Sequence, residues 1–128
     1  MDLPPSRIDD LIQELTQENF INEARFVESF VNGKIRIKKW GRLKVKLALK
    51  NKGLPPSLIA SGLESIDQKE YARIMQHLIT TKSQMVKDEN PMVRKSKVVR
   101  FMMGKGFEPD LVWEHVNQMD WKPLSNPD

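Results

Sequence analysis

"KNKGLPPSLIASGLESI", residues 50–66, contains the end of one helix, a break and the start of another. Glycine at position 53 suits the left-handed conformation that ends helices, and the two prolines preset the backbone for a first helical turn. A second stretch, "MGKGFEPDLVWEHVNQM" (residues 103–119), has the same layout. When the two are aligned on Leu54 and Phe107, each has Lys-Gly before it, proline at +2 and apolar residues at +5, +9 and +12. The chain therefore makes the same corner twice.

The N-terminus fits the same template, with Leu3 as its anchor and Leu15 at +12. The three anchors lie 51 and 53 residues apart, and a period of about 50 residues indicates an internal repeat. We predict the last helix of a truncated first unit at 1–18, complete three-helix units at 19–66 and 67–119, and a flexible tail at 120–128.

Apolar residues at three- and four-residue spacing predict helix along most of the chain. The first helix opens at Pro4-Pro5-Ser6, and Asn22 is the expected cap of the second, which carries Phe26, Val27, Phe30 and Val31 on one stripe. Further helices are expected at 40–52, 57–66, 67–87, 92–105 and 110–119. The predicted fold is all-α: an elongated array of three-helix repeats, one partial and two complete, with corners like those of helix-turn-helix proteins.

Composition excludes several classes of protein. The 128 residues contain no cysteine, so there is no disulfide and no thiolate metal site. No apolar run approaches the ~20 residues that span a bilayer, and the first ten residues do not resemble a secretory signal. We expect a monomeric protein in the cytoplasm.

Charge is unevenly distributed along the chain, although the net charge is only +4. Residues 29–63 contain no Asp or Glu but nine Lys and Arg residues, and the rest of the chain is acidic overall. Such a block favours a polyanionic partner or an acidic protein surface over an ordinary solvated face. The candidate binding residues are Arg36, Lys38, Lys39, Trp40, Arg42, Lys46, Lys50, Arg94, Lys97 and Arg100.

Four of these residues have helical spacing. Lys39, Arg42, Lys46 and Lys50 are three or four residues apart, which places them on one face of the helix expected at 40–52. Trp40 either stacks on a nucleic-acid base or anchors the helix in the core. The equivalent helix of the last unit carries Arg94, Lys97 and Arg100, so the two units together predict a continuous basic track.

Residues for catalysis or for a cofactor are not apparent. His77 and His115 lie in different units, without a partner at metal-ligand spacing, and are interpreted as surface or half-buried histidines. The glycines form neither a phosphate-binding loop nor a dinucleotide motif. We expect a protein that is not an enzyme and has no cofactor.

Three stretches of the chain resemble the RecX family, the regulators of the bacterial RecA recombinase. They are "LTQENFINEARFVESFVNGK", "KKWGRLKVKLALKNKGL" and "KSKVVRFMMGKGFEPDLVWEHV", which together cover about residues 12–118. Members of the family usually have three complete units, so this chain lacks the start of the first. The resemblance implies a modulator, expected to be an inhibitor, that binds in the groove of the RecA–single-stranded DNA filament. Such a regulator would act in homologous recombination, DNA repair and the SOS response.

Two alternatives remain open at the level of sequence. The chain could be a DNA-binding module for single-stranded or double-stranded DNA without sequence preference. Sequence readout is disfavoured because the second helix of the corner, "PPSLIASGLES", has no Arg, Lys, Asn or Gln to read base edges. The other alternative is a helical-repeat adaptor that binds an acidic protein and no nucleic acid.

Overall fold

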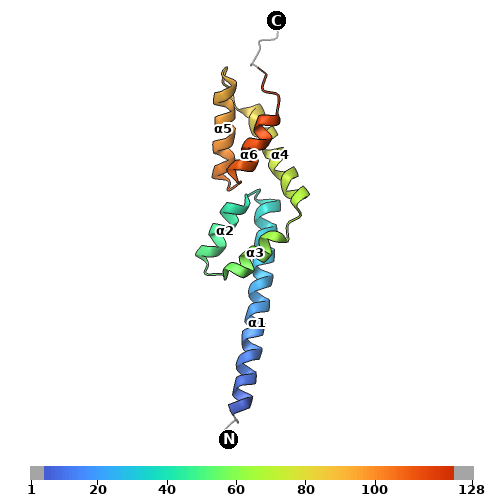
Figure 1. The fold of residues 1–128 in the computed structure, drawn as a ribbon, viewed down its shortest axis with the longest axis vertical. Helices are drawn as coiled ribbons and strands as arrows, with labels where there is room; N and C mark the ends of the chain where they lie inside the picture. Colours follow the sequence, from blue (N-terminus) through green and yellow to red (C-terminus); the bar gives the residue numbers. More distant parts are fainter. Residues whose placement is uncertain (1–4, 123–128) are drawn as a thin grey trace.

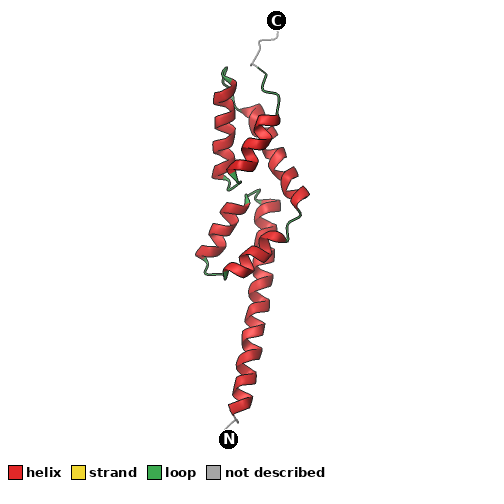
Figure 2. Cartoon of the chain, viewed as in Figure 1, coloured by secondary structure: helices red, strands yellow, loops and turns green. Residues whose placement is uncertain are grey.

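The computed structural model describes residues 5–122, with side chains placed from Asp10 onward except at position 12, and this part of the chain contains no strand. The all-α class predicted from the sequence is confirmed (Figure 2). In chain order the elements are α1 (Pro5–Asn32), a π-helical turn η1 (Gly33–Ile37), α2 (Arg42–Asn51), α3 (Pro56–Glu64), α4 (Gln68–Met85), α5 (Pro91–Gly104) and α6 (Pro109–Gln118).

The helices form two groups that follow each other along an elongated molecule (Figure 1). In the first group, α3 packs against α2 and against the C-terminal half of α1. In the second group, α4, α5 and α6 pack against one another. The N-terminal half of α1 projects away from both groups, and every side chain described between residues 10 and 22 is exposed.

The first part of the chain differs from the prediction. Two helices were expected before residue 32, the second capped by Asn22, and this expectation is wrong because α1 is continuous through that position. No proline or glycine occurs between Ser6 and Asn32, so nothing in the local sequence ends the helix. The predicted stripe is also only partly correct, since Val27 and Val31 are buried but the Phe26 side chain is 45% exposed.

The helix expected from position 40 begins at Arg42 instead. Lys39 adopts a left-handed conformation with φ of 59°, and Gly41 is extended, so the backbone is not helical directly before α2. The other ends agree closely with the prediction. Gly53 and Gly106 have φ of 82° and 94° after α2 and α5, and the Asp67 carboxylate accepts the Glu70 N–H at the start of α4.

The two groups meet where the start of α2 lies against the end of α5. The Gly41 N–H donates to the Lys105 carbonyl over 2.7 Å, and the Leu43 N–H donates to the Gly106 carbonyl over 2.9 Å. A Cβ on Gly41 would lie 2.2 Å from the Gly106 carbonyl carbon, so the two backbones are in direct contact. We call this contact the joint.

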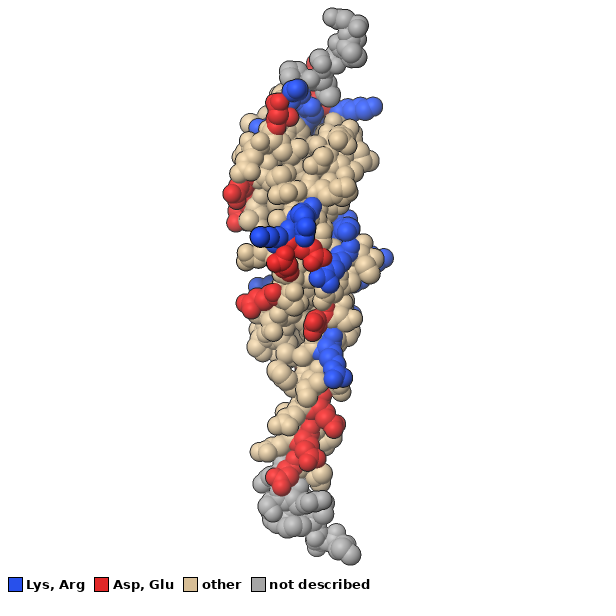
Figure 3. Space-filling view, turned by 90° about the vertical axis from the view of Figure 1, so that its right-hand side faces the viewer, with Lys and Arg blue, Asp and Glu red and all other residues tan. Residues whose placement is uncertain are grey.

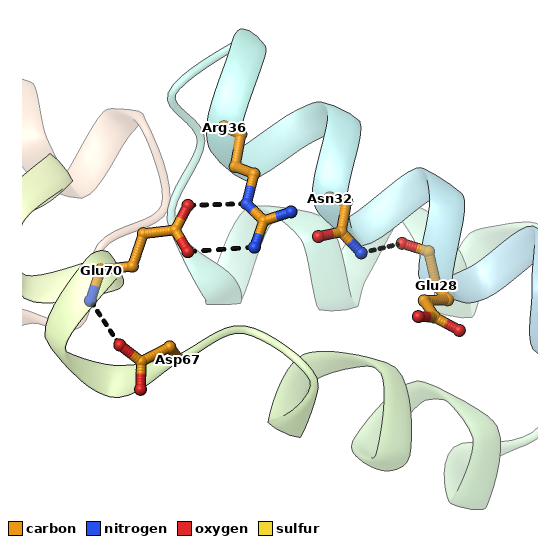
Figure 4. Close-up of polar contacts among 5 residues, drawn as sticks. All are labelled: Glu28, Asn32, Arg36, Asp67 and Glu70. Carbon is orange, nitrogen blue, oxygen red and sulfur yellow. Dashed lines mark hydrogen bonds and ion pairs between the residues drawn. The ribbon is translucent and has the colours of Figure 1, made fainter.

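Side chains reinforce the joint on two sides. The Tyr71 hydroxyl accepts the Arg42 N–H over 3.0 Å and donates to the Glu108 carboxylate, which also pairs with the Arg42 guanidinium over 2.9 Å. On the second side, the Arg36 guanidinium donates to both carboxylate oxygens of Glu70 over 2.6 and 3.0 Å (Figure 4). These contacts join residues 29 to 66 positions apart in the sequence.

The repeat boundaries predicted at 18/19, 66/67 and 119/120 remain predictions. Most of the tail predicted at 120–128, the anchor Leu3, and the side chains of Ile8 and Ile12 lie outside the described residues. None of the helices described between residues 5 and 122 combines the length and the apolar character needed to cross a bilayer.

Candidate nucleic-acid interface

The structure separates the ten predicted site residues by exposure. Lys38, Lys46, Lys50, Lys97 and Arg100 are exposed. Arg36 is also exposed, but Glu70 holds its guanidinium in a two-bond pair. The hydrogen bond from Arg36 is the main cause that lowers the pKa of the Glu70 carboxyl below its ordinary value. The Arg36 guanidinium is therefore already paired at the joint and is less available to an external anion.

Arg94 is not on the surface. Its residue is 6% exposed, one guanidinium nitrogen donates to the Lys122 carbonyl, and the group lies 5.7 Å from the centroid of the Trp121 ring. Its Nε has no hydrogen-bond partner among the described residues. The expectation that Arg94 belongs to an exposed basic face is wrong, because the segment after α6 covers it.

The four-residue stripe predicted on one helical face is also divided. Lys39 precedes α2, and Arg42 turns inward, with its guanidinium carbon 3.8 Å from the centroid of the Tyr71 ring. Only Lys46 and Lys50 remain as an exposed pair on α2. The stripe fails because helical spacing identifies the side of the helix and does not identify which cation finds a carboxylate 66 residues away.

Trp40 combines features of both interpretations. Its ring is half-buried and packs against the core, as expected for an anchor. The Lys34 and Lys44 ammonium groups also lie 4.7 and 4.5 Å from its centroid. An indole between two cations forms a basic–aromatic surface of the kind that binds single-stranded nucleic acid.

Phe30 extends this surface. Its ring centroid is 5.4 Å from the Lys34 ammonium and 5.8 Å from that of Lys52. We call the group formed by Phe30, Lys34, Trp40, Lys44 and Lys52 the first lysine–aromatic cluster. It draws on α1, η1, the turn before α2, and the two ends of α2.

A smaller group of the same type occurs in the second half of the molecule. The ammonium groups of Lys82 and Lys105 lie 4.4 and 5.8 Å from the centroid of the Phe101 ring. Lys52 and Lys105 occupy the same place in the repeated corner, directly before Gly53 and Gly106. Phe101, Lys82 and Lys105 form the second lysine–aromatic cluster.

The charges of both clusters suit a phosphate chain. Lysine ammonium groups contact phosphates, and aromatic faces stack with bases of any type, at roughly 1–3 kcal/mol per base. Of these eight residues, sequence analysis named only Trp40 as a site residue. Lys34, Lys44 and Lys52 lie in the basic block at 29–63, but only the folded chain shows which lysines lie over aromatic rings.

Neither histidine belongs to a lysine–aromatic cluster. His77 is exposed and lines a shallow hollow of about 320 Å³ with Lys39, Glu70 and Arg73. His115 is half-buried on α6. Within residues 10–122, apart from the side chain at position 12, no group of His, Asp and Glu has the arrangement of a metal site.

Comparison with known proteins gave consistent matches. The family model "RecX, second three-helix domain" matches residues 22–63, from the middle of α1 to the last turn of α3. Proteins named "Regulatory protein RecX" match over most of the chain: that of Clostridium tetani is 30% identical over 114 residues, covering 88% of this chain and 50% of its own length. The chain belongs to the RecX family.

Other RecX proteins match only in part of their length. That of Lactococcus lactis subsp. lactis is 29% identical over 103 residues, and that of Chlorobaculum tepidum is 29% identical over 107 residues. These matches cover 79% and 84% of this chain, but 38% and 62% of the relatives. The chain thus spans about half the length of its RecX relatives. No solved structure gave a significant match.

Proposed function

We propose that this RecX-family chain regulates the RecA recombinase, with inhibition as the direction, by binding along the groove of the RecA–single-stranded DNA filament. Binding would modulate the ATPase and strand-exchange activities of RecA in recombination and DNA repair. The observation that carries the proposal is the pair of lysine–aromatic clusters, one in each half of an elongated molecule, in a chain with RecX relatives.

The shape of the molecule supports binding along a filament. Two sites in successive units of an extended chain can contact successive parts of a polymer, whereas one compact patch cannot. The joint holds the two units together through backbone hydrogen bonds, so both clusters belong to one body. Lys38 and Arg100 provide further exposed positive charge in the first and second halves.

A DNA-binding module without RecA is the second candidate function. The structure disfavours base readout by α3, because Leu58, Ile59 and Gly62 are buried and a Cβ at position 62 would lie 2.4 Å from the Val27 Cγ1 atom. That helix is thus fixed against α1 and has no long polar side chain for a groove. Contact with phosphates and stacking on single strands remain available to the clusters.

The deciding experiment is a titration of the single-strand-dependent ATPase of RecA with this chain, with single-strand binding measured in parallel without RecA. Loss of ATPase activity when the concentration of the chain is equal to or below that of RecA supports regulation of the filament. An unchanged ATPase with retained DNA binding supports the module. If neither changes, the adaptor for an acidic protein is the reading that remains.

A further inference from the structure

A groove between α2 and α3 lies outside the two lysine–aromatic clusters. It has a volume of about 480 Å³, and Leu54, Ile59 and Leu63 are among the apolar side chains that line it. Lys46 and Lys50 stand at its α2 side, and neither forms an ion pair with another described residue. The groove therefore presents an apolar floor beside a row of two positive charges.

The projecting half of α1 carries the complementary pattern. Leu11 and Leu15 are 41% and 65% exposed and follow one another on the same side of the helix. Asp10, Glu14 and Glu18 are exposed and form an adjoining row, because they too are four residues apart. Acidic side chains gather along this end of the molecule in Figure 3. An apolar stripe thus lies beside an acidic stripe.

This helical half cannot reach the groove of its own chain. The contact of α1 with α3 includes Val27, which lies against Gly62. Leu15 lies twelve residues earlier on the same continuous helix, about 18 Å further along the axis at 1.5 Å per residue. A helix of this kind gains most of its stability from packing an apolar face, so a partner that covers Leu11 and Leu15 would stabilise it.

We propose that the projecting half of α1 docks in the α2–α3 groove of a second copy of this chain. Leu11 and Leu15 enter the apolar floor, and the carboxylates of Glu14 and Glu18 face the ammonium groups of Lys46 and Lys50. Both charged pairs have a separation of four helical residues, about 6 Å, so the two rows match in length. Reciprocal docking gives a closed two-fold dimer, which departs from the monomer expected from the sequence.

The charges allow a strict test by sedimentation velocity over a wide range of chain concentration. The wild-type chain is expected to show a dimer whose affinity falls with added salt. Reversal of either row, in E14K/E18K or in K46E/K50E, is expected to weaken dimerisation about tenfold or more, because like charges then oppose each other. The matched control is K69E/K87E, which reverses two exposed lysines outside the groove and leaves the dimer intact.

Restored complementarity separates docking from a general effect of charge. An equimolar mixture of E14K/E18K with K46E/K50E is expected to form a heterodimer, since each α1 then meets a groove of opposite charge. The chain with all four reversals is expected to dimerise by itself. Circular dichroism checks that each variant keeps its helix content.

Two results overturn the proposal. A wild-type chain that stays monomeric at every concentration rules out docking between two copies. A dimer that survives both reversals uses another surface. Neither result depends on RecA, so the test is independent of the proposed function.

Discussion

The Tyr71 ring and the Arg42 guanidinium stack at 3.8 Å across the joint, although 29 residues separate them in the chain. The same tyrosine hydroxyl binds the first N–H of α2 and the Glu108 carboxylate. One side chain of α4 therefore contacts the start of α2 and the start of α6. Four properties of the molecule should depend on this region or on the clusters beside it.

The first prediction concerns the Tyr71 hydroxyl. Tyr71→Phe is expected to lower the free energy of unfolding by about 1–3 kcal/mol, because it leaves the Arg42 N–H and one Glu108 oxygen without their partner in a half-buried site. Urea denaturation followed by circular dichroism measures the change. Ser83→Ala is the control, since its exposed hydroxyl only bonds back to the Thr80 carbonyl, and it should change stability by less than about 0.5 kcal/mol. Equal effects of the two variants would contradict the role given to Tyr71.

The second prediction concerns ionisation of the same residue. Burial, followed by the hydrogen bond to Glu108, raises the pKa of the Tyr71 phenol well above its ordinary value. A raised folded-state pKa gives stability that is complete below the unfolded pKa of about 10 and is lost as the pH rises above it. The folded chain should therefore resist ionisation and unfold in alkali as the phenol loses its proton.

The chain is suited to this measurement because Tyr71 is its only tyrosine. Near-ultraviolet absorbance of tyrosinate then reports one group, and circular dichroism reports the fold. Both signals should change together, above pH ~10. A phenol that titrates near pH 10 with the helices intact would show that the site is open to water.

The third prediction tests the backbone contact at the joint. Gly41→Ala places a methyl group 2.2 Å from the Gly106 carbonyl carbon, so the two groups must separate, and stability should fall by about 1–3 kcal/mol or more. Gly33→Ala is the matched control, because its Cβ would meet no atom within 4 Å and its φ is not positive. That control should be neutral or slightly stabilising. Thermal unfolding compares the two, and equal melting temperatures would mean that the joint is loose.

The fourth prediction concerns nucleic acid. Lys52→Gln with Lys105→Gln removes one ammonium group from each lysine–aromatic cluster. If each contacts a phosphate, the slope of log affinity for single-stranded DNA against log salt should become shallower by about 1.4, which is about 0.7 per contact. Fluorescence anisotropy at several salt concentrations gives this slope. Lys69→Gln with Lys87→Gln changes two exposed lysines elsewhere, and an equal loss in this control would point to net charge alone.

Features set by local sequence could be predicted. The corners at Gly53 and Gly106 follow from the need for positive φ after a helix, and Asp67 caps α4 as its position indicates. The all-α class follows from apolar spacing in the same way. These signals come from neighbouring residues, so the rest of the fold does not alter them.

Features set by distant contacts could not be predicted. Arg42 and Arg94 appear equivalent to Lys46 and Arg100 in sequence, yet Glu108 pairs with Arg42 and the segment around Trp121 covers Arg94. Trp40 was found because an aromatic residue within a basic block is conspicuous. Lys34 and Lys82 were missed because only the folded chain brings their ammonium groups over rings.

The contact between Gly41 and Gly106 has a consequence for how the molecule meets a periodic target. Two backbone hydrogen bonds cross the joint, and neither group of helices can turn about the other without breaking them. The two lysine–aromatic clusters are consequently kept at a constant separation and a constant relative angle. The two clusters therefore act at a fixed spacing. A polymer whose repeat matches this spacing can contact both clusters at once, and a polymer with a different repeat can contact only one.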